Sequence, residues 1–238
     1  MIEHALQQVN KRIQQACLTN HRPTDAVTLL AVSKTFGSDD VRAALDCGQH
    51  RFGENYVQEA LDKIQALGDV RAQLEWHLIG PLQSNKTRPV AEQFDWVQSV
   101  DRLKIAQRLS EQRPEHLPPL NVLLQVNTSG EDSKSGVAPA EVAALARAVS
   151  ALPRLRLRGL MALPAPTPDE ASQLAAHRGL KALFDNLVAT GLSLDTLSMG
   201  MSADLEAAIA EGATLVRVGT AIFGGRPKPA DLEASSRP

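Results

Sequence analysis

The chain has 238 residues, of which 43% are hydrophobic and 22% are charged, and its formal net charge is −2. This length fits one large domain better than two. The small net charge gives no general attraction to nucleic acid or to an anionic membrane, and an aromatic content of 3% argues against a surface on which bases stack.

Nothing in the sequence predicts export or membrane insertion. The N-terminal segment contains no apolar core of a signal peptide, and no apolar run approaches the length of a membrane-spanning helix. The two cysteines, Cys17 and Cys47, do not form a CxxC pair, and we interpret them as reduced thiols. We therefore expect a cytoplasmic protein.

Helices and strands alternate along the sequence. An amphipathic helix is expected first, because apolar residues recur at helical spacing from Ile2 to Ala16. The apolar runs that follow are nearly continuous, as expected for parallel strands buried on both faces. We predict strands over 27–33, 49–53, 74–79, 96–100, 120–126, 155–163, 196–199 and 215–218, and helices over 38–47, 55–67, 83–93, 101–112, 139–151, 168–190 and 203–211.

This alternation is typical of a (β/α)₈ TIM barrel with an extra N-terminal helix. An open doubly wound sheet is the alternative, but the residues after the first strand, 34–37, cannot form a GxGxxG loop. We predict one barrel domain over residues 1–225. The polar, proline-rich tail 226–238 is predicted to be disordered.

Lys34 directly follows the first apolar strand, at the barrel end where such proteins collect their functional groups. Desolvation at this position favours the neutral amine, which is the form that makes a Schiff base. For an isolated lysine, a side chain that reaches solvent is the more common explanation.

The loops after the seventh and eighth strands frequently form a phosphate site in barrels. Ser202 offers a hydroxyl there, and Gly219 with Thr220 offers close backbone approach and a second hydroxyl. Taken separately, Ser202 could be a helix-capping serine, and Gly219 with Thr220 could form an ordinary turn. Because they fall at both of these loops, a phosphate site is favoured.

Arg217 lies inside the last apolar strand, so it must point into the barrel lumen or pair with a carboxylate. A permanent cation beside a pyridine nitrogen would keep that nitrogen unprotonated and weaken the ring as an electron sink. Asn55, after the second strand, offers a ligand a neutral donor and acceptor, and is equally well explained as a helix N-cap.

Other polar residues near strand ends are less informative. We interpret His77, within the third strand, as a packed and hydrogen-bonded core residue, and Lys86 as part of a solvated helix face. The fifth strand leads to Asn127 and a polar loop over 128–136, which is either an anion site or an ordinary mobile loop. The six histidines show no metal-binding spacing, so no metal site is predicted.

Seven segments in a fixed order carry a resemblance that runs from about the first strand through Gly224. They are LLAVSKT, RFGENYVQEA, EWHLIGPLQSNK, SGEDSKSGV, LRLRGLMALPAP, LSMGMSADLEAAI and VRVGTAIFG. Together they resemble the YggS/PROSC family of pyridoxal phosphate homeostasis proteins, whose fold is similar to the N-terminal barrel of alanine racemase.

The resemblance implies a site for pyridoxal 5′-phosphate (PLP). The implied roles are a Schiff-base lysine, a phosphate cradle, an arginine near the pyridine nitrogen and an asparagine that lines the pocket. The matching residues are, in that order, Lys34; Ser202, Gly219 and Thr220; Arg217; and Asn55. One departure is visible, because many relatives continue with Lys-Pro where this chain has Phe36-Gly37.

The resemblance implies a non-catalytic carrier that buffers PLP or delivers it, with apo forms of PLP-dependent enzymes as recipients, and we expect a monomer. An amino-acid racemase is one alternative, but racemisation needs a second proton donor, which in alanine racemase is a tyrosine from a second domain. Here the only tyrosine is Tyr56, and the chain leaves no room for that domain, so at most slow side reactivity is expected. A class I aldolase is more remote, because its lysine more often lies on a mid-barrel strand and it has no need of Arg217.

Overall fold

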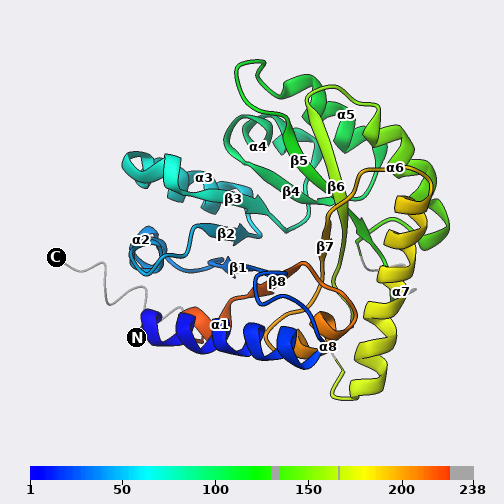
Figure 1. Cartoon of the computed structure of the whole chain (residues 1–238). Helices are drawn as coiled ribbons and strands as arrows, with labels where there is room; N and C mark the ends of the chain where they lie inside the picture. The colour runs from blue at the N-terminus through cyan, green and yellow to red at the C-terminus, as the bar shows by residue number, and fades with distance from the viewer. Residues whose placement is uncertain (130–134, 166, 226–238) are drawn as a thin grey trace.

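The computed structural model describes residues 1–129, 135–165 and 167–225 (Figure 1). The sequence-predicted tail 226–238 and the middle of the 128–136 loop lie outside these residues. The strands are β1 (Thr28–Val32), β2 (Arg51–Glu54), β3 (Glu75–Leu78), β4 (Trp96–Val100), β5 (Leu120–Val126), β6 (Leu155–Ala162), β7 (Thr196–Ser198) and β8 (Leu215–Val218). The α-helices are α1 (Ile2–Thr19), α2 (Ser38–Asp46), α3 (Val57–Ala66), α4 (Thr87–Gln93), α5 (Leu103–Gln112), α6 (Val142–Ser150), α7 (Glu170–Ala189), α8 (Leu205–Ala210) and α9 (Thr220–Phe223), and short 3₁₀ helices cover Gly68–Gln73, Ser84–Lys86 and Pro139–Glu141.

The strands form a closed parallel barrel in chain order, and β8 pairs with β1 to complete it. The register of this last pair places Leu30 opposite Arg217. Most strand residues are buried, as expected when one face of each strand fills the lumen and the other packs under helices. The predicted (β/α)₈ barrel with an N-terminal helix is therefore confirmed.

Helix boundaries differ from the prediction where a local interaction sets them. The helix expected over 168–190 begins at Glu170, because Asp169 caps it by accepting a hydrogen bond from the amide of Ser172. The short helix α9 was not predicted, since a single turn is too brief to show periodicity.

Helix α1 lies outside the barrel and packs against α8 and α9 (Figure 1). Its buried face contains the apolar residues that were spaced at helical intervals, from Leu6 to Ala16. Arg12 on the same helix pairs with Glu206 of α8 at 2.9 Å and donates to the carbonyl of Ser202 at 3.1 Å. No helix among the described residues has the length and apolar character needed to cross a membrane.

Two glycines allow backbones to meet closely. A Cβ atom on Gly80, after β3, would lie 2.1 Å from the carbonyl oxygen of Asn55. A Cβ atom on Gly159 of β6 would lie 1.8 Å from the carbonyl oxygen of Thr196. Both distances are far inside van der Waals contact, so neither position accepts a side chain without backbone movement.

We predict that Gly159→Ala lowers the free energy of unfolding by about 3 kcal/mol or more, because the added methyl group must push β6 away from β7. The matched control is Gly179→Ala, on the exposed face of α7, where a Cβ meets nothing within 4 Å. This control should gain roughly 0.5–1 kcal/mol from helix propensity. Urea unfolding measures both changes, and equal stability of the two variants would contradict the close-approach argument.

Candidate functional site

A pocket of about 330 Å³ opens at the C-terminal end of the barrel. It contains all the residues that the sequence proposed for cofactor binding, contributed by segments after β1, β2, β7 and β8 and by β8 itself. The lining residues are Val32, Lys34, Thr35, Phe36, Asn55, Ile79, Leu163, Met201, Ser202, Ala203, Arg217, Gly219, Thr220 and Gly224.

Lys34 is half-buried and lies two residues beyond the end of β1. The next residue, Thr35, has a φ of 69°, which is unusual for a β-branched side chain. The amide of Thr35 donates a 2.6 Å hydrogen bond to the carboxylate of Glu59. Such backbone strain persists only where the surroundings enforce it, so the direction of Lys34 is fixed by neighbouring structure.

A buried cluster of charged groups provides that enforcement. The ammonium of Lys63 donates to the carbonyl of Ser33 at 2.7 Å, to Glu54 at 2.7 Å and to Glu59 at 2.6 Å. The hydroxyl of Ser33 also donates to Glu54 at 2.6 Å. Burial raises the pKa of Glu54, and the Lys63 and Ser33 contacts offset part of that rise. We call Ser33, Glu54, Glu59 and Lys63 the lysine clamp, because their contacts hold the backbone on both sides of Lys34. Lys63 and Glu54 bind Ser33, and Glu59 binds the amide of Thr35.

Asn55 is not the N-cap of α3, which is Tyr56, so the capping explanation is wrong. The backbone of Asn55 lies against Gly80, and the side chain lines the pocket. Within the described residues its Oδ1 atom is buried and has no hydrogen-bond partner. Because buried polar atoms usually have a hydrogen-bond partner and Asn55 lines the pocket, a polar molecule bound there would supply the missing contact.

The two proposed phosphate loops meet at the pocket, where they contribute Ser202, Gly219 and Thr220. A Cβ atom on Gly219 would lie 3.0 Å from the carbonyl oxygen of Val32, so glycine allows β8 to end against β1. Of the three residues, Thr220 is exposed and the others are partly buried.

Asp204 shapes the first of these loops. It accepts hydrogen bonds from the amide of Met201 at 2.6 Å and from His177 at 3.0 Å. Burial raises the pKa of Asp204, but these hydrogen bonds outweigh burial and hold the pKa below its usual value. The loop that carries Ser202 is therefore anchored to α7, which supplies His177.

Arg217 points into the lumen, and only 2% of it is exposed. It donates to Ser198 at 2.6 Å and to the carbonyl of Ala162 at 2.7 Å. Desolvation lowers the pKa of Arg217 to about 10, which leaves it charged at neutral pH. Within the described part of the chain no carboxylate lies within ion-pair distance of Arg217. Of the two arrangements expected from the sequence, Arg217 therefore adopts the one that points into the barrel lumen, and it does not pair with a carboxylate.

Phe36 belongs to the Phe36-Gly37 pair, where Lys-Pro is expected in many relatives. Its ring stacks on Phe223 of α9, with centroids 5.2 Å apart and planes at 30°. Phe36 also lines the pocket. The departure from the family pattern therefore adds an apolar contact between the Lys34 loop and the segment that carries Thr220.

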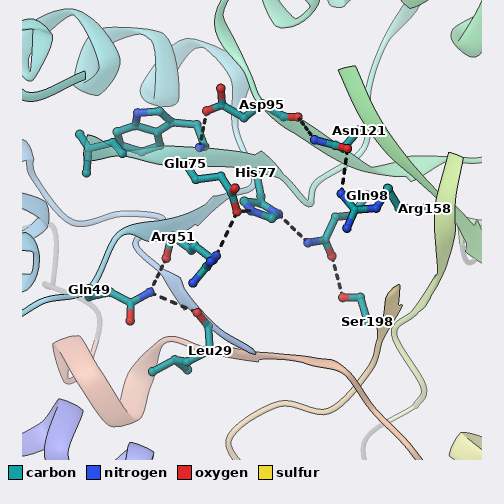
Figure 2. Close-up of polar contacts among 12 residues, drawn as sticks. Leu29, Gln49, Arg51, Glu75, His77, Asp95, Gln98, Asn121, Arg158 and Ser198 are labelled. Carbon is teal, nitrogen blue, oxygen red and sulfur yellow. Dashed lines mark hydrogen bonds and ion pairs between the residues drawn. The ribbon is translucent and has the colours of Figure 1, made fainter. Parts of the chain in front are cut away.

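The structure also tests the less informative predictions. His77 is fully buried and hydrogen-bonded to Glu75 and Gln98, so the core interpretation is confirmed (Figure 2). Lys86 is exposed, as expected. The anion-site alternative for the 128–136 loop falls largely on residues that are not described.

Sequence reasoning missed Lys63, Glu54 and Asp204. Lys63 follows Glu59 by four residues on an amphipathic helix. Because this spacing usually belongs to an ion pair on the solvent-exposed face of a helix, it did not indicate a buried lysine. For Glu54, the only clue in the sequence was its position at the end of the apolar strand β2. A carboxylate at the end of a buried strand needs a hydrogen-bond or ion-pair partner.

Comparison with known proteins places the chain among characterised families. The model of the alanine racemase N-terminal domain matches residues 5–227. The chain is also similar to a solved structure of PipY from Synechococcus elongatus with PLP bound, at 38% identity and a TM-score of 0.80, covering 94% of this chain and 100% of that one.

Two curated relatives are similar over nearly their whole length. The pyridoxal phosphate homeostasis protein of Pseudomonas aeruginosa is 60% identical over 225 residues, which cover 94% of this chain and 96% of the relative. The protein of the same name from Escherichia coli K12 is 54% identical over 226 residues, with 94% and 97% covered. The chain therefore belongs to the YggS/PROSC family of pyridoxal phosphate homeostasis proteins, within the alanine racemase N-terminal domain family.

Proposed function

We propose that the chain binds PLP as a Schiff base on Lys34 and acts in PLP homeostasis as a cytoplasmic carrier that buffers or delivers the cofactor. The observation that carries this proposal is the composition of one pocket, in which a strand-end lysine, a buried guanidinium and two glycine- and hydroxyl-containing loops line the same space. Its volume of about 330 Å³ suits a small cofactor.

The residues present fit PLP. When bound, PLP supplies an aldehyde that condenses with a primary amine and a ring that absorbs visible light. Lys34 would provide the amine, and Ser202, Gly219 and Thr220 would hold the phosphate. Arg217 would face the pyridine nitrogen as a cation. The unpartnered Oδ1 of Asn55 supports a polar guest.

The same residues favour a carrier over a racemase. Arg217 would keep the pyridine nitrogen unprotonated, which disfavours carbanion chemistry. The chain's one tyrosine, Tyr56, is 59% exposed and does not line the pocket, so it is not placed as a second proton donor. The names of the curated relatives also indicate homeostasis rather than a reaction.

The relatives and the barrel support a simple organisation. We propose that residues 1–225 act as one PLP-binding unit, that the protein is a monomer, and that apo forms of PLP-dependent enzymes receive the cofactor.

We predict that borohydride reduction of the PLP-loaded protein fixes one PLP on the peptide that contains Lys34. Lys34→Ala should lose this adduct, because the amine that condenses with the aldehyde is gone. The control is Lys104→Ala, an exposed lysine of α5 that should keep the adduct. Peptide mass spectrometry measures the modification, and an undiminished adduct on the same region in Lys34→Ala would refute the assignment.

Steady-state turnover of D- and L-amino acids tests the carrier function separately. We expect interconversion far below that of dedicated racemases, since no tyrosine, histidine, cysteine or carboxylic acid is among the described residues that line the pocket. A chiral assay of the PLP-loaded protein measures the rate. Turnover at the level of a true racemase would show that the protein is an enzyme.

The lysine clamp predicts a coupled loss of stability and of PLP retention. Lys63→Met leaves Glu54 and Glu59 without their shared cation, which should cost about 3 kcal/mol of unfolding free energy. It also releases Thr35 from its strained backbone, so less PLP should be fixed on Lys34. Urea unfolding and the borohydride adduct measure the two effects.

The control for Lys63→Met is Lys181→Met, in which a partly exposed lysine of α7 loses its partner Asp185. Exposed pairs of this kind contribute little, so stability should change by no more than about 0.5 kcal/mol and PLP retention should not change. Equal effects of the two substitutions would show that the clamp does not hold Lys34.

A further inference from the structure

A single file of hydrogen bonds runs through the barrel lumen, from the pocket described above toward a second pocket at the opposite end. The second pocket has a volume of about 400 Å³ and lies where β2, β3 and β4 begin, since Arg51, Glu75 and Trp96 line it. Of these two pockets, Arg217 lines the first and not the second, whereas Glu75 and His77 line the second and not the first.

The file links these two ends in four steps. Arg217 donates to the hydroxyl of Ser198 at 2.6 Å, and Ser198 donates to Oε1 of Gln98 at 2.6 Å. Nε2 of Gln98 lies 2.9 Å from Nδ1 of His77, and Nε2 of His77 lies 2.9 Å from the carboxylate of Glu75. Figure 2 shows the four members from Ser198 to Glu75, which come from β7, β4 and β3.

The two ends fix the direction of every bond between them. A guanidinium can only donate, so the oxygen of Ser198 accepts from Arg217 and its proton must go to Gln98. A carboxylate can only accept, so His77 donates from Nε2 to Glu75 and its Nδ1 must accept from the amide of Gln98. All four dipoles therefore point the same way, from a cation at one end to an anion at the other.

This arrangement requires His77 to be neutral. Burial lowers the pKa of His77, although the nearby carboxylate of Glu75 partly opposes this effect. A proton on Nδ1 would face the amide of Gln98 donor to donor. Turning that amide would then place its NH₂ group toward Ser198 and leave the hydroxyl proton of Ser198 without its acceptor.

The file of hydrogen bonds bears on how the buried positive charge of Arg217 is stabilised. A buried cation without an adjacent carboxylate is costly, and neutral hydrogen-bond partners must stabilise its charge. Aligned hydrogen bonds polarise one another in a low-dielectric interior, so the carboxylate of Glu75 acts on Arg217 through three neutral groups. Gln98 and Ser198 are fully buried and reach each other across the lumen, which leaves little freedom in this geometry.

We propose that Ser198, Gln98 and His77 form a positioning relay that holds the guanidinium of Arg217 toward the pocket and stabilises its charge through Glu75 at the other end of the barrel. The relay rests on the proposed function in one respect, namely that PLP is the molecule that Arg217 meets. Its members are positioning residues, since none of the three lines the PLP pocket.

The first test needs no PLP. Long-range ¹H–¹⁵N NMR of the apo protein, with His77→Asn to assign the signals, reports which ring nitrogen of His77 carries the proton. We expect Nε2 protonated and Nδ1 unprotonated at neutral pH. In Gln98→Met the Nδ1 signal should move toward that of a nitrogen without a hydrogen bond. A protonated Nδ1 in the unsubstituted protein would overturn the relay.

The second test uses the PLP-loaded protein and its visible spectrum. Gln98→Met and Ser198→Ala break the file at different links, and Arg217→Met removes its end. We expect the first two variants to bind PLP roughly tenfold more weakly. Their absorption maxima should move in the same direction as that of Arg217→Met, because the ring nitrogen no longer meets a fixed cation.

The control is Gln125→Met, a buried glutamine of β5 whose amide donates to the carbonyl of Ser135, outside the relay. It should keep the parent affinity and spectrum. Relay variants that keep the parent spectrum while Arg217→Met changes it would overturn the relay, as would a spectrum that Arg217→Met leaves unchanged.

The two tests separate the relay from the function. If the unsubstituted protein forms no reducible adduct on Lys34, the proposed function is wrong, and the tautomer of His77 still decides the relay. If Gln98→Met fails to fold by circular dichroism, Ser198→Ala breaks the same file by removing a single oxygen atom.

Discussion

The pairing of β8 with β1 is the contact on which the rest of the site depends. It joins segments nearly two hundred residues apart and sets Leu30 opposite Arg217. One consequence is that the residues after β1 and after β8 leave the barrel side by side. Lys34 and Thr220 line the same pocket, and Gly219 lets the two backbones approach closely there. A shift of one residue in this register would turn Arg217 away from the lumen.

Two of the buried cations, Lys63 and Arg217, are stabilised in opposite ways. Lys63 has two carboxylates at 2.6–2.7 Å and serves as structural support beneath the Lys34 loop. Arg217 has only neutral oxygens as direct partners among the described residues, and its pKa is lowered accordingly. A cation that is already neutralised would interact weakly with a ligand, whereas one supported by dipoles keeps its field directed at the pocket. Of these two cations, only Arg217 lines the pocket at the C-terminal end of the barrel.

Sequence patterns could predict the residues whose type conflicts with their surroundings. Lys34 after an apolar strand and Arg217 inside one both require an explanation, and strand counting places them at the same end of a barrel. Gln98 and Ser198 could not be found this way, because each reads as an ordinary strand residue until closure of the barrel brings β4 and β7 across the lumen. The stacking of Phe36 on Phe223 was invisible for the same reason, since no local spacing connects them. Helix ends were inaccurate where one side chain, such as Asp169, decides the boundary.

Helix α1 precedes the barrel in sequence, yet it and the residues just after it contact the segment between β7 and β8 near the end of the chain. Arg12 holds the carbonyl of Ser202, and Arg22, just after the helix, donates to the carbonyls of Ile209 and Ala213 at 2.7 Å. The first helix and the β7–α8 segment are therefore one mechanical unit. Chimeras between relatives should exchange these two segments together, and an affinity tag fused to Met1 would directly precede a helix whose Arg12 contacts the loop that carries Ser202.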